Sequence, residues 1–195
     1  IPVIAIQKLE HAVPLAEALV AGGITNLEVT LRTQHGLKAI TLIRDQVKGA
    51  NVGVGTVCNA TEFDSAVDAG ANFVVSPGQS DALFDRALLT NIPFLPGAVT
   101  ATEVIASKEA GFNVLKFFPA STSGGAAAIK AFAGPFADLQ FVPTGGINLD
   151  NAGSYLSLSN VRAVGGSWLT PADAIQNGQW EHITQIAREA SQLGA

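Results

Sequence analysis

The chain has 195 residues, of which 48% are hydrophobic and 14% charged, so it suits one domain with a large core and is no disordered or highly charged tail. The formal net charge of −5, without any Lys/Arg cluster, argues against nucleic-acid binding. A single cysteine, Cys58, excludes a disulfide framework, and no apolar stretch reaches the ~20 residues of a membrane span, so we expect a cytoplasmic protein.

Short runs rich in β-branched residues alternate with Ala-rich amphipathic stretches along the chain. The runs predict strands near 2–6, 27–31, 52–55, 72–76, 92–96, 113–117, 140–144 and 161–165. The stretches predict helices near 11–21, 35–48, 60–69, 80–90, 102–110, 125–132 and 150–158, then a pair near 172–177 and 181–193. Because the first residues already form a predicted strand, we expect the natural start to lie before Ile1.

Eight strand–helix units in succession predict a parallel sheet that is covered on both faces. Eight units fit a (β/α)8 TIM barrel, one domain over residues 1–195, although about 250 residues is typical of that fold. An open doubly wound sheet is the main alternative. Active sites of such barrels form at the carboxyl ends of the strands, so polar residues at these ends are the candidates.

One face of the second predicted strand carries polar side chains. In LEVTLRT, side-chain alternation places Glu28, Thr30 and Arg32 toward the barrel interior, whereas Val29 and Leu31 suit contact with outer helices. The interior of such a barrel is usually filled by aliphatic residues, so a carboxylate and a guanidinium on this face call for a function.

The run LKFFPA at 115–120 holds a lysine among apolar residues, and alternation puts Lys116 and Phe118 on one face with Val114. Lys116 then meets Glu28 and Arg32 in the interior. Because an unpaired charge is costly to bury, three charged groups together at strand ends predict an active site. The structural alternatives are an ion pair that only closes the barrel and a lysine that faces the surface.

The three residue types point to a particular chemistry. A lysine in apolar surroundings loses its proton more readily, and the free amine can attack a carbonyl and form a Schiff base. Glu28 is the acid that can move the protons which cleavage of the neighbouring C–C bond requires. Arg32 can hold a carboxylate through two hydrogen bonds. The set predicts carbon–carbon lyase chemistry on a 2-keto acid.

Two glycine pairs end the last two predicted strands, in PTGGI at 143–147 and VGGSW at 164–168. Barrels often bind phosphate in these two loops, at helix N-termini, and glycine lets backbone N–H groups approach an anion closely. We therefore expect an anion site there, with two tight turns as the alternative.

Other motifs predict no chemistry. GVGTVC at 53–58 has Cys58 where a dinucleotide fingerprint has its third glycine. His11, His35 and His182 lie on separate predicted helices without metal-ligand spacing, so we expect them on helix surfaces. Cys58 is expected to pack rather than react. We expect no metal and no organic cofactor.

The whole set of motifs resembles one family. KLEHAVPLAEALVAGG, LEVTLRT, VGVGTV, VVSPG, LKFFPA, AGPF, PTGGI and GGSWL, in this order, resemble the bacterial 2-keto-3-deoxy-6-phosphogluconate (KDPG) aldolases, also called 4-hydroxy-2-oxoglutarate (KHG) aldolases. The resemblance covers essentially the whole chain. It implies a class I, metal-independent aldolase with a (β/α)8 barrel that assembles as a homotrimer.

The resemblance also implies roles for individual residues. Lys116 would form the Schiff base and Glu28 would act as general acid and base. The pyruvate end would be bound by Arg32 and Thr56, in a pocket lined by Pro77 and Phe118. The far end and the phosphate site would be formed by Thr144 and Ser167 with the backbone of Gly145, Gly146, Gly165 and Gly166.

This sequence departs from the family pattern in two places. The helix that normally precedes the first strand and caps the barrel bottom is missing. Ser121 stands where the family often has an acidic residue, and this exchange would alter the rim of the site and the choice of substrate.

The sequence leaves several functions open. The leading one is reversible cleavage of KDPG into pyruvate and glyceraldehyde 3-phosphate, and the next is cleavage of 4-hydroxy-2-oxoglutarate into pyruvate and glyoxylate. A third is an unrelated phosphate-binding barrel, such as an epimerase, in which Lys116 forms no imine. A fourth is a sugar-acid binding protein without catalysis, against which the intact set of Glu28, Arg32 and Lys116 argues.

Overall fold

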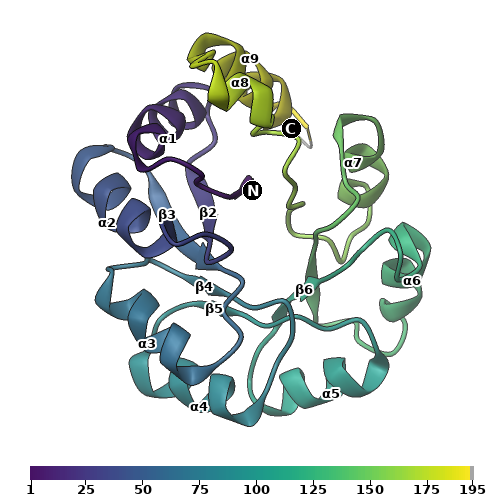
Figure 1. Cartoon of the computed structure of the whole chain (residues 1–195). Helices are drawn as coiled ribbons and strands as arrows, with labels where there is room; N and C mark the ends of the chain where they lie inside the picture. Colours follow the sequence, from purple (N-terminus) through teal and green to yellow (C-terminus); the bar gives the residue numbers. More distant parts are fainter. Residues whose placement is uncertain (194–195) are drawn as a thin grey trace.

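Strands and helices alternate along the chain and form a closed (β/α)8 barrel, in a computed structural model that describes residues 1–193 (Figure 1). The strands are β1 (Val3–Ile4), β2 (Asn26–Thr30), β3 (Asn51–Gly55), β4 (Val74–Val75), β5 (Phe94–Leu95), β6 (Val114–Phe117) and β7 (Gln140–Pro143). The helices are a 3-10 turn η1 (Leu9–His11), α1 (Ala12–Ala21), α2 (Gly36–Gln46), α3 (Ala60–Asp68), α4 (Asp81–Thr90), α5 (Ala101–Glu109), α6 (Gly125–Phe132), α7 (Leu149–Leu156), α8 (Ala172–Gln176) and α9 (Trp180–Ser191). The predicted barrel is therefore confirmed.

Two regular sheets and a few single bridges make up the ring of strands. β1 to β5 pair in chain order in one parallel sheet, and β6 pairs with β7. A bridge from Gly97 to Lys116 joins the two sheets. Gly165 bridges to Thr144 and Gly166 bridges to Pro2, which closes the ring and excludes an open doubly wound sheet.

The eighth predicted strand, 161–165, lies at the predicted place in the ring, but it is not a regular strand. The segment makes isolated bridges instead of a continuous ladder. Its end is the Gly165–Gly166 pair, which brings no side chains to pack against neighbouring strands. β1, β4 and β5 are shorter than predicted, and prolines precede two of them, β1 and β5. Pro2 and Pro93 have no backbone N–H to donate to a ladder.

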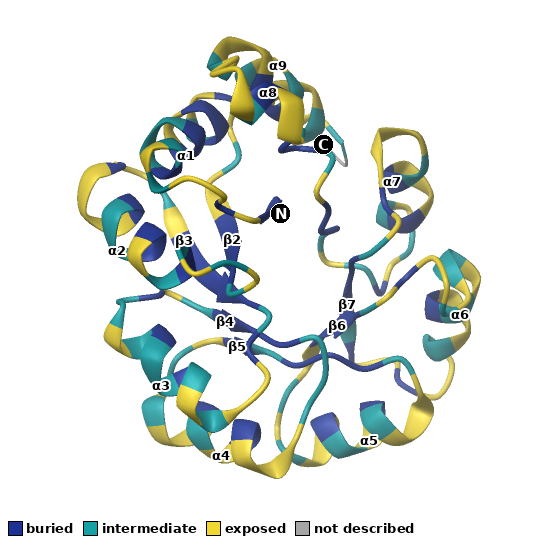
Figure 2. Cartoon of the chain, viewed as in Figure 1, coloured by how far each residue is buried: buried dark blue, intermediate teal, exposed yellow. Residues whose placement is uncertain are grey.

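Side-chain alternation separates an outer from an inner layer of the barrel. Val29, Val54 and Leu115 are fully buried between the strands and the helices, and each helix turns its buried face inward (Figure 2).

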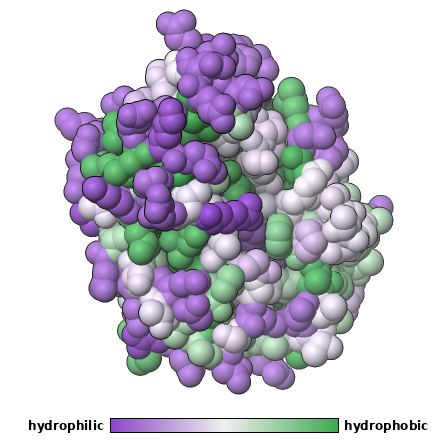
Figure 3. Space-filling view, in the orientation of Figure 1, coloured by the Kyte–Doolittle hydropathy of each residue, from purple (hydrophilic) through white to green (hydrophobic). Residues whose placement is uncertain are grey.

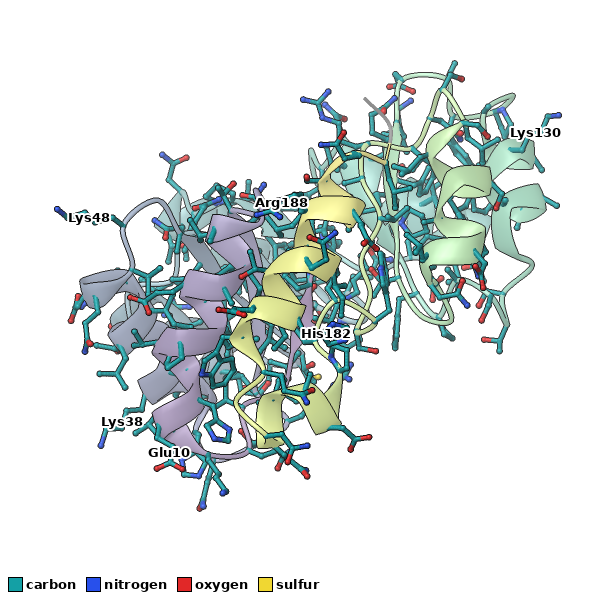
Figure 4. All side chains as sticks on the ribbon, turned by 90° about the horizontal axis from the view of Figure 1, so that it is seen from above. Glu10, Lys38, Lys48, Lys130, His182 and Arg188 are labelled. Atoms are coloured by element: carbon teal, nitrogen blue, oxygen red, sulfur yellow. The ribbon has the colours of Figure 1, made fainter. Side chains whose placement is uncertain are left out.

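None of the helices within residues 1–193 has the length and the apolar character that a bilayer crossing requires. The cations of α2, α6 and α9 labelled in Figure 4 project from separate parts of the molecule, so they form no common basic surface.

The inner layer differs from the aliphatic filling of most barrels. Four glycines take inward positions opposite polar residues: Gly53 pairs with Glu28, Gly55 with Thr30, Gly97 with Lys116 and Gly165 with Thr144. Since such positions normally carry Val, Ile or Leu, these glycines leave room inside the barrel for polar side chains.

Candidate active site

Lys116 and Glu28 meet inside the barrel from opposite walls, β6 and β2. The Lys116 Nζ donates a hydrogen bond of 3.0 Å to the Glu28 Oε1, and each side chain is only 4% exposed. Lys116 is therefore no surface lysine. A buried ion pair of this kind contributes little net stability, because desolvation offsets the attraction between the charges. Barrel closure alone is thus a weak reason to place the pair here.

Gly55 gives the Glu28 carboxylate its space. A Cβ atom on Gly55 would lie 2.2 Å from the Glu28 Oε1 and 2.7 Å from its Cγ. Sequence reasoning did not single out this glycine. The signal was present in NVGVG at 51–55, where outward valines alternate with inward glycines along β3.

Phe118 forms one wall beside the lysine. Its ring centroid lies 5.4 Å from the Lys116 Nζ, within the range in which an aromatic face attracts an ammonium. A Cβ on Gly145 would lie 3.3 Å from the same ring, so the first loop glycine packs directly against Phe118. Pro77 lies nearby, since its carbonyl would be 2.2 Å from a Cβ on Gly97, the residue that bridges to Lys116.

Arg32 and Thr56 lie together at the mouth. The Arg32 Nε donates to the Thr56 Oγ1 at 3.3 Å, and the Arg32 side chain is exposed. The prediction that Arg32 points into the interior is wrong, because β2 ends at Thr30 and the alternation ends with it. Thr56 has a φ of 65°, a left-handed conformation that is rare for a β-branched residue and that clusters at functional sites.

The glycine pair after β7 suits an anion better than the other pair does. Gly145 and Gly146 have φ values of 100° and 72°. Within residues 1–193, neither N–H group has a protein acceptor, and the same holds for the N–H of Ser167. Ser121 supports this loop from the rim, because its N–H donates to the Gly145 carbonyl at 3.1 Å.

The Gly165–Gly166 pair closes the barrel instead. The Gly165 N–H donates to the Pro143 carbonyl at 2.8 Å, and the Gly166 N–H donates to the Ile1 carbonyl at 3.0 Å. The expectation that both N–H groups face an anion is therefore wrong, because backbone pairing already uses them. A side chain at Gly166 would collide with the Trp168 ring rather than enter the site.

Helix N-termini also contribute less than expected. The Asn148 side chain caps α7 and accepts hydrogen bonds from the N–H groups of Asp150 and Asn151. The anion-binding capacity of this helix start is thus already occupied by its own cap.

A cavity of about 490 Å³ opens at the mouth beside Ser167, between the end of β1 and α8. Its lining includes Ala5, Gln7 and Lys8. The face around the barrel axis mixes hydrophilic and hydrophobic residues, with strongly hydrophilic atoms near its centre (Figure 3). Thr144 lies deeper and is buried, with its hydroxyl in the place that a side chain at Gly165 would take.

Of the remaining candidates, Cys58 and His182 do not line this cavity, whereas His11 does. Cys58 is exposed rather than packed, and partial burial together with the nearby Glu62 charge raises the pKa of its thiol, which disfavours the reactive thiolate. His11 packs edge-to-face on Trp180, with 5.7 Å between the ring centroids, whereas His182 on α9 is exposed (Figure 4). Within residues 1–193, no group of three or more His, Cys, Asp or Glu side chains could hold a metal ion.

The Gly55 contact can be tested directly. We expect Gly55→Ala to push the Glu28 carboxylate away from Lys116 and to lower kcat by roughly 10²-fold, because displacements of about 1 Å have effects of this size. Gly153→Ala on α7 is the matched control, since a Cβ there meets nothing within 4 Å. Steady-state kinetics of both variants provide the measurement. An unchanged kcat in Gly55→Ala would show that the carboxylate position is not limited by this glycine.

Comparison with known proteins adds a family pattern to this geometry. Residues 1–186 match a family model described as KDPG and KHG aldolase. The chain is 50% identical over 190 residues to the 2-dehydro-3-deoxy-phosphogluconate aldolase of Dickeya dadantii, which covers 97% of this chain and 89% of that protein. It is 48% identical, with the same coverage, to the KHG/KDPG aldolase of Escherichia coli K12.

A solved structure is similar over nearly the whole chain. It is the crystal structure of KDPG aldolase from Legionella pneumophila with pyruvate captured at low pH as a covalent carbinolamine intermediate. Its TM-score is 0.96 at 45% sequence identity, and the match covers 98% of this chain and 93% of the other.

Proposed function

Since this chain belongs to the KDPG and KHG aldolase family, we propose that the site around Lys116 and Glu28 cleaves KDPG reversibly into pyruvate and glyceraldehyde 3-phosphate through a Schiff base. The observation that carries the proposal is the buried contact of 3.0 Å between the Lys116 Nζ and the Glu28 Oε1. A nucleophile and a base within hydrogen-bond reach of each other are the signature of covalent catalysis.

The contact provides the first proton transfer. When the ammonium proton moves from Lys116 to Glu28, the free amine can attack the C2 carbonyl carbon of the keto acid. Glu28 then returns this proton to the hydroxyl group of the resulting carbinolamine, which leaves as water. An iminium remains on Lys116, and Glu28 is again a carboxylate. The burial of Lys116 and Glu28, with the Phe118 ring beside the lysine, gives this step a confined space.

Cleavage then needs one base and one electron sink. Glu28 takes the proton of the C4 hydroxyl, the C3–C4 bond breaks, and its electron pair moves toward the iminium nitrogen to give an enamine and the aldehyde product. Glu28 returns a proton to C3, and water hydrolyses the imine to release pyruvate and free Lys116. In this scheme one carboxylate acts alternately as base and acid.

The mouth residues would bind the two ends of the substrate. Arg32, supported by Thr56, would hold the carboxylate of the pyruvate half, and Pro77 and Phe118 would line the space around its reacting carbons. The free N–H groups of Gly145, Gly146 and Ser167 would bind the phosphate, with Thr144 between the two ends. Gly165 and Gly166 would shape this end of the site without donating to the anion.

The same site would accept 4-hydroxy-2-oxoglutarate, because a second carboxylate can replace phosphate at the glycine N–H groups. The relative from Escherichia coli is named for both activities.

We also propose that the protein works in the cytoplasm as a homotrimer. An epimerase-like barrel and a non-catalytic sugar-acid binding protein remain as outcomes of the assay.

The activity is tested with the purified chain and both substrates. We expect pyruvate release from KDPG, measured by coupled reduction with lactate dehydrogenase, at a higher kcat/KM than from 4-hydroxy-2-oxoglutarate. Activity should persist with a strong chelator, because Lys116 and Glu28 account for the chemistry without a metal ion. Tight substrate binding without turnover would favour the binding protein, and interconversion of sugar epimers would favour the epimerase.

The phosphate end is tested at Ser167. We expect Ser167→Asp to raise KM for KDPG by roughly 10- to 100-fold, because a carboxylate beside the anion repels phosphate. Ser167→Asn is the matched control, as it has nearly the same shape without the charge. Borohydride trapping of pyruvate should stay unchanged in both variants. If Asp and Asn raise KM equally, the phosphate does not bind beside Ser167.

A further inference from the structure

Arg32 lies in the short connection from β2 to α2, at the substrate mouth, and the residues on both sides of it are tied to neighbouring strands. Toward β3, the Leu31 N–H donates a hydrogen bond of 3.0 Å to the Gly55 carbonyl. Toward β1, the Thr33 Oγ1 donates a hydrogen bond of 2.7 Å to the Ile6 carbonyl. The backbone of Arg32 is therefore held between two anchors.

The Thr33 hydroxyl both donates and accepts in this arrangement. Its Oγ1 accepts the His35 N–H at 3.3 Å, a local side-chain bond that threonine makes in turns. Within residues 1–193, no other group donates a hydrogen bond to the Ile6 carbonyl. The backbone pairing of β1 with β2 ends at Ile4, so Thr33 extends the connection between these two segments toward the mouth.

The side chain of Arg32 needs such support because little else holds it. It is exposed, and its one hydrogen bond within the described residues runs from Nε to the Thr56 Oγ1 at 3.3 Å. An arginine that binds a carboxylate loses much of its conformational freedom. If its backbone is fixed beforehand, only the side chain has to be ordered, and less of the binding free energy is lost.

We propose that Thr33 is a positioning residue, whose hydroxyl fixes the backbone beside Arg32 so that the guanidinium meets the carboxylate of the pyruvate half. The proposal rests on the carboxylate-binding role of Arg32 proposed above. Thr33 acts through Arg32 and not on the substrate, because its hydroxyl proton is directed to the Ile6 carbonyl. The alternative is that Thr33 contributes to stability alone.

The test compares Thr33→Val, which keeps the shape of the side chain without its hydroxyl, with Thr33→Ser, which keeps the hydroxyl. We expect Thr33→Val to raise KM for KDPG, and the pyruvate concentration for half-maximal borohydride trapping, by roughly 3- to 10-fold, the effect of one lost hydrogen bond. Its kcat should change by less than about twofold, because the carboxylate is held equally before and during the reaction. Thr33→Ser should keep the values of the unchanged chain.

Thr41→Val is the matched control. Thr41 lies on α2, is half-buried like Thr33, and donates its hydroxyl to the Ala69 carbonyl at 3.2 Å. This variant therefore loses a hydrogen bond of the same kind in the outer layer of helices. It should lower the thermal stability about as much as Thr33→Val does, without a change in KM.

A double variant decides whether Thr33 acts through Arg32. Arg32→Ala alone should raise KM, and the addition of Thr33→Val should raise it no further, because two residues that act as one unit are not additive. If the two increases multiply, or if Thr33→Val alone leaves KM unchanged, the proposal is overturned. It is also overturned if Thr33→Ser or Thr41→Val raises KM as much as Thr33→Val does.

Thr33→Ala gives the same comparison if the valine variant does not fold, since it also lacks the hydroxyl. The failure of the proposed function is a different result. If the unchanged chain traps no pyruvate, or if Arg32→Ala leaves KM unchanged, the role of Arg32 in binding the carboxylate is wrong and that of Thr33 falls with it. If Arg32→Ala raises KM and Thr33→Val does not, only the role of Thr33 is wrong.

Discussion

Lys116→Met should abolish covalent capture of pyruvate and lower kcat by roughly 10⁴-fold or more, the scale on which removal of a nucleophile acts. The side chain is buried and lies 3.0 Å from the Glu28 carboxylate, so no exposed lysine can replace its amine. Borohydride reduction with pyruvate, followed by peptide mapping, should place the adduct at Lys116 in the unchanged chain and show none in the variant.

Lys116→Arg is the matched control for charge. It keeps a cation beside Glu28, but a guanidinium stays protonated and cannot attack a carbonyl, so this variant should be as inactive as Lys116→Met. Lys116→Met also leaves Glu28 buried without its cation, a loss that destabilises by about 3–5 kcal/mol. The double variant Glu28→Gln/Lys116→Met should recover much of that stability. An adduct at another lysine would remove Lys116 from the mechanism.

Glu28→Gln should lower kcat by about 10²–10⁴-fold, the usual contribution of general acid–base catalysis. The amide keeps the shape of the side chain and can still accept a hydrogen bond from the Lys116 Nζ, but it cannot take a proton. We therefore expect imine formation with pyruvate to persist more slowly, while deuterium uptake from D2O into the pyruvate methyl group is lost.

Glu28→Asp separates position from chemistry in this experiment. The shorter side chain keeps a carboxylate but withdraws it from the contact of 3.0 Å, so its kcat should lie between those of the unchanged chain and the glutamine variant. Stopped-flow and steady-state kinetics on KDPG give the comparison. A near-normal kcat for Glu28→Gln would mean that another group or a water moves the proton.

The sequence predicted the barrel because each strand–helix unit carries its own signal. Helices began and ended within about two residues of the expected positions, since polar N-caps start them locally and glycines such as Gly70 and Gly111 end them. The alternation along β2 and β6 was enough to place Glu28 and Lys116 in one interior, where the structure has them in contact. The helix ends and the strand alternation could be predicted because both depend on residues that are close together in the sequence.

Other features depend on pairing between distant segments and could not be predicted. Gly165 and Gly166 resembled an anion loop in sequence, but their N–H groups are used by Pro143 and Ile1, far away in the chain. Arg32 is exposed because β2 ends at Thr30, one residue before its predicted end and two residues before Arg32.

The bridge between Gly97 and Lys116 joins the two sheets on one side of the ring, and the bridges of Gly165 and Gly166 join them on the other. Glu28 belongs to the sheet of β1 to β5 and Lys116 to the pair of β6 and β7, and the backbone of Lys116 itself joins them through Pro96 and Ala98. Each part has its own apolar cluster. Neither half contains both Lys116 and Glu28, so the proposed catalytic pair forms only when the two halves pack together. Lys116 thus joins the two sheets through its backbone and supplies the amine of the proposed Schiff base through its side chain. This amine contacts the Glu28 carboxylate only when the two halves pack together.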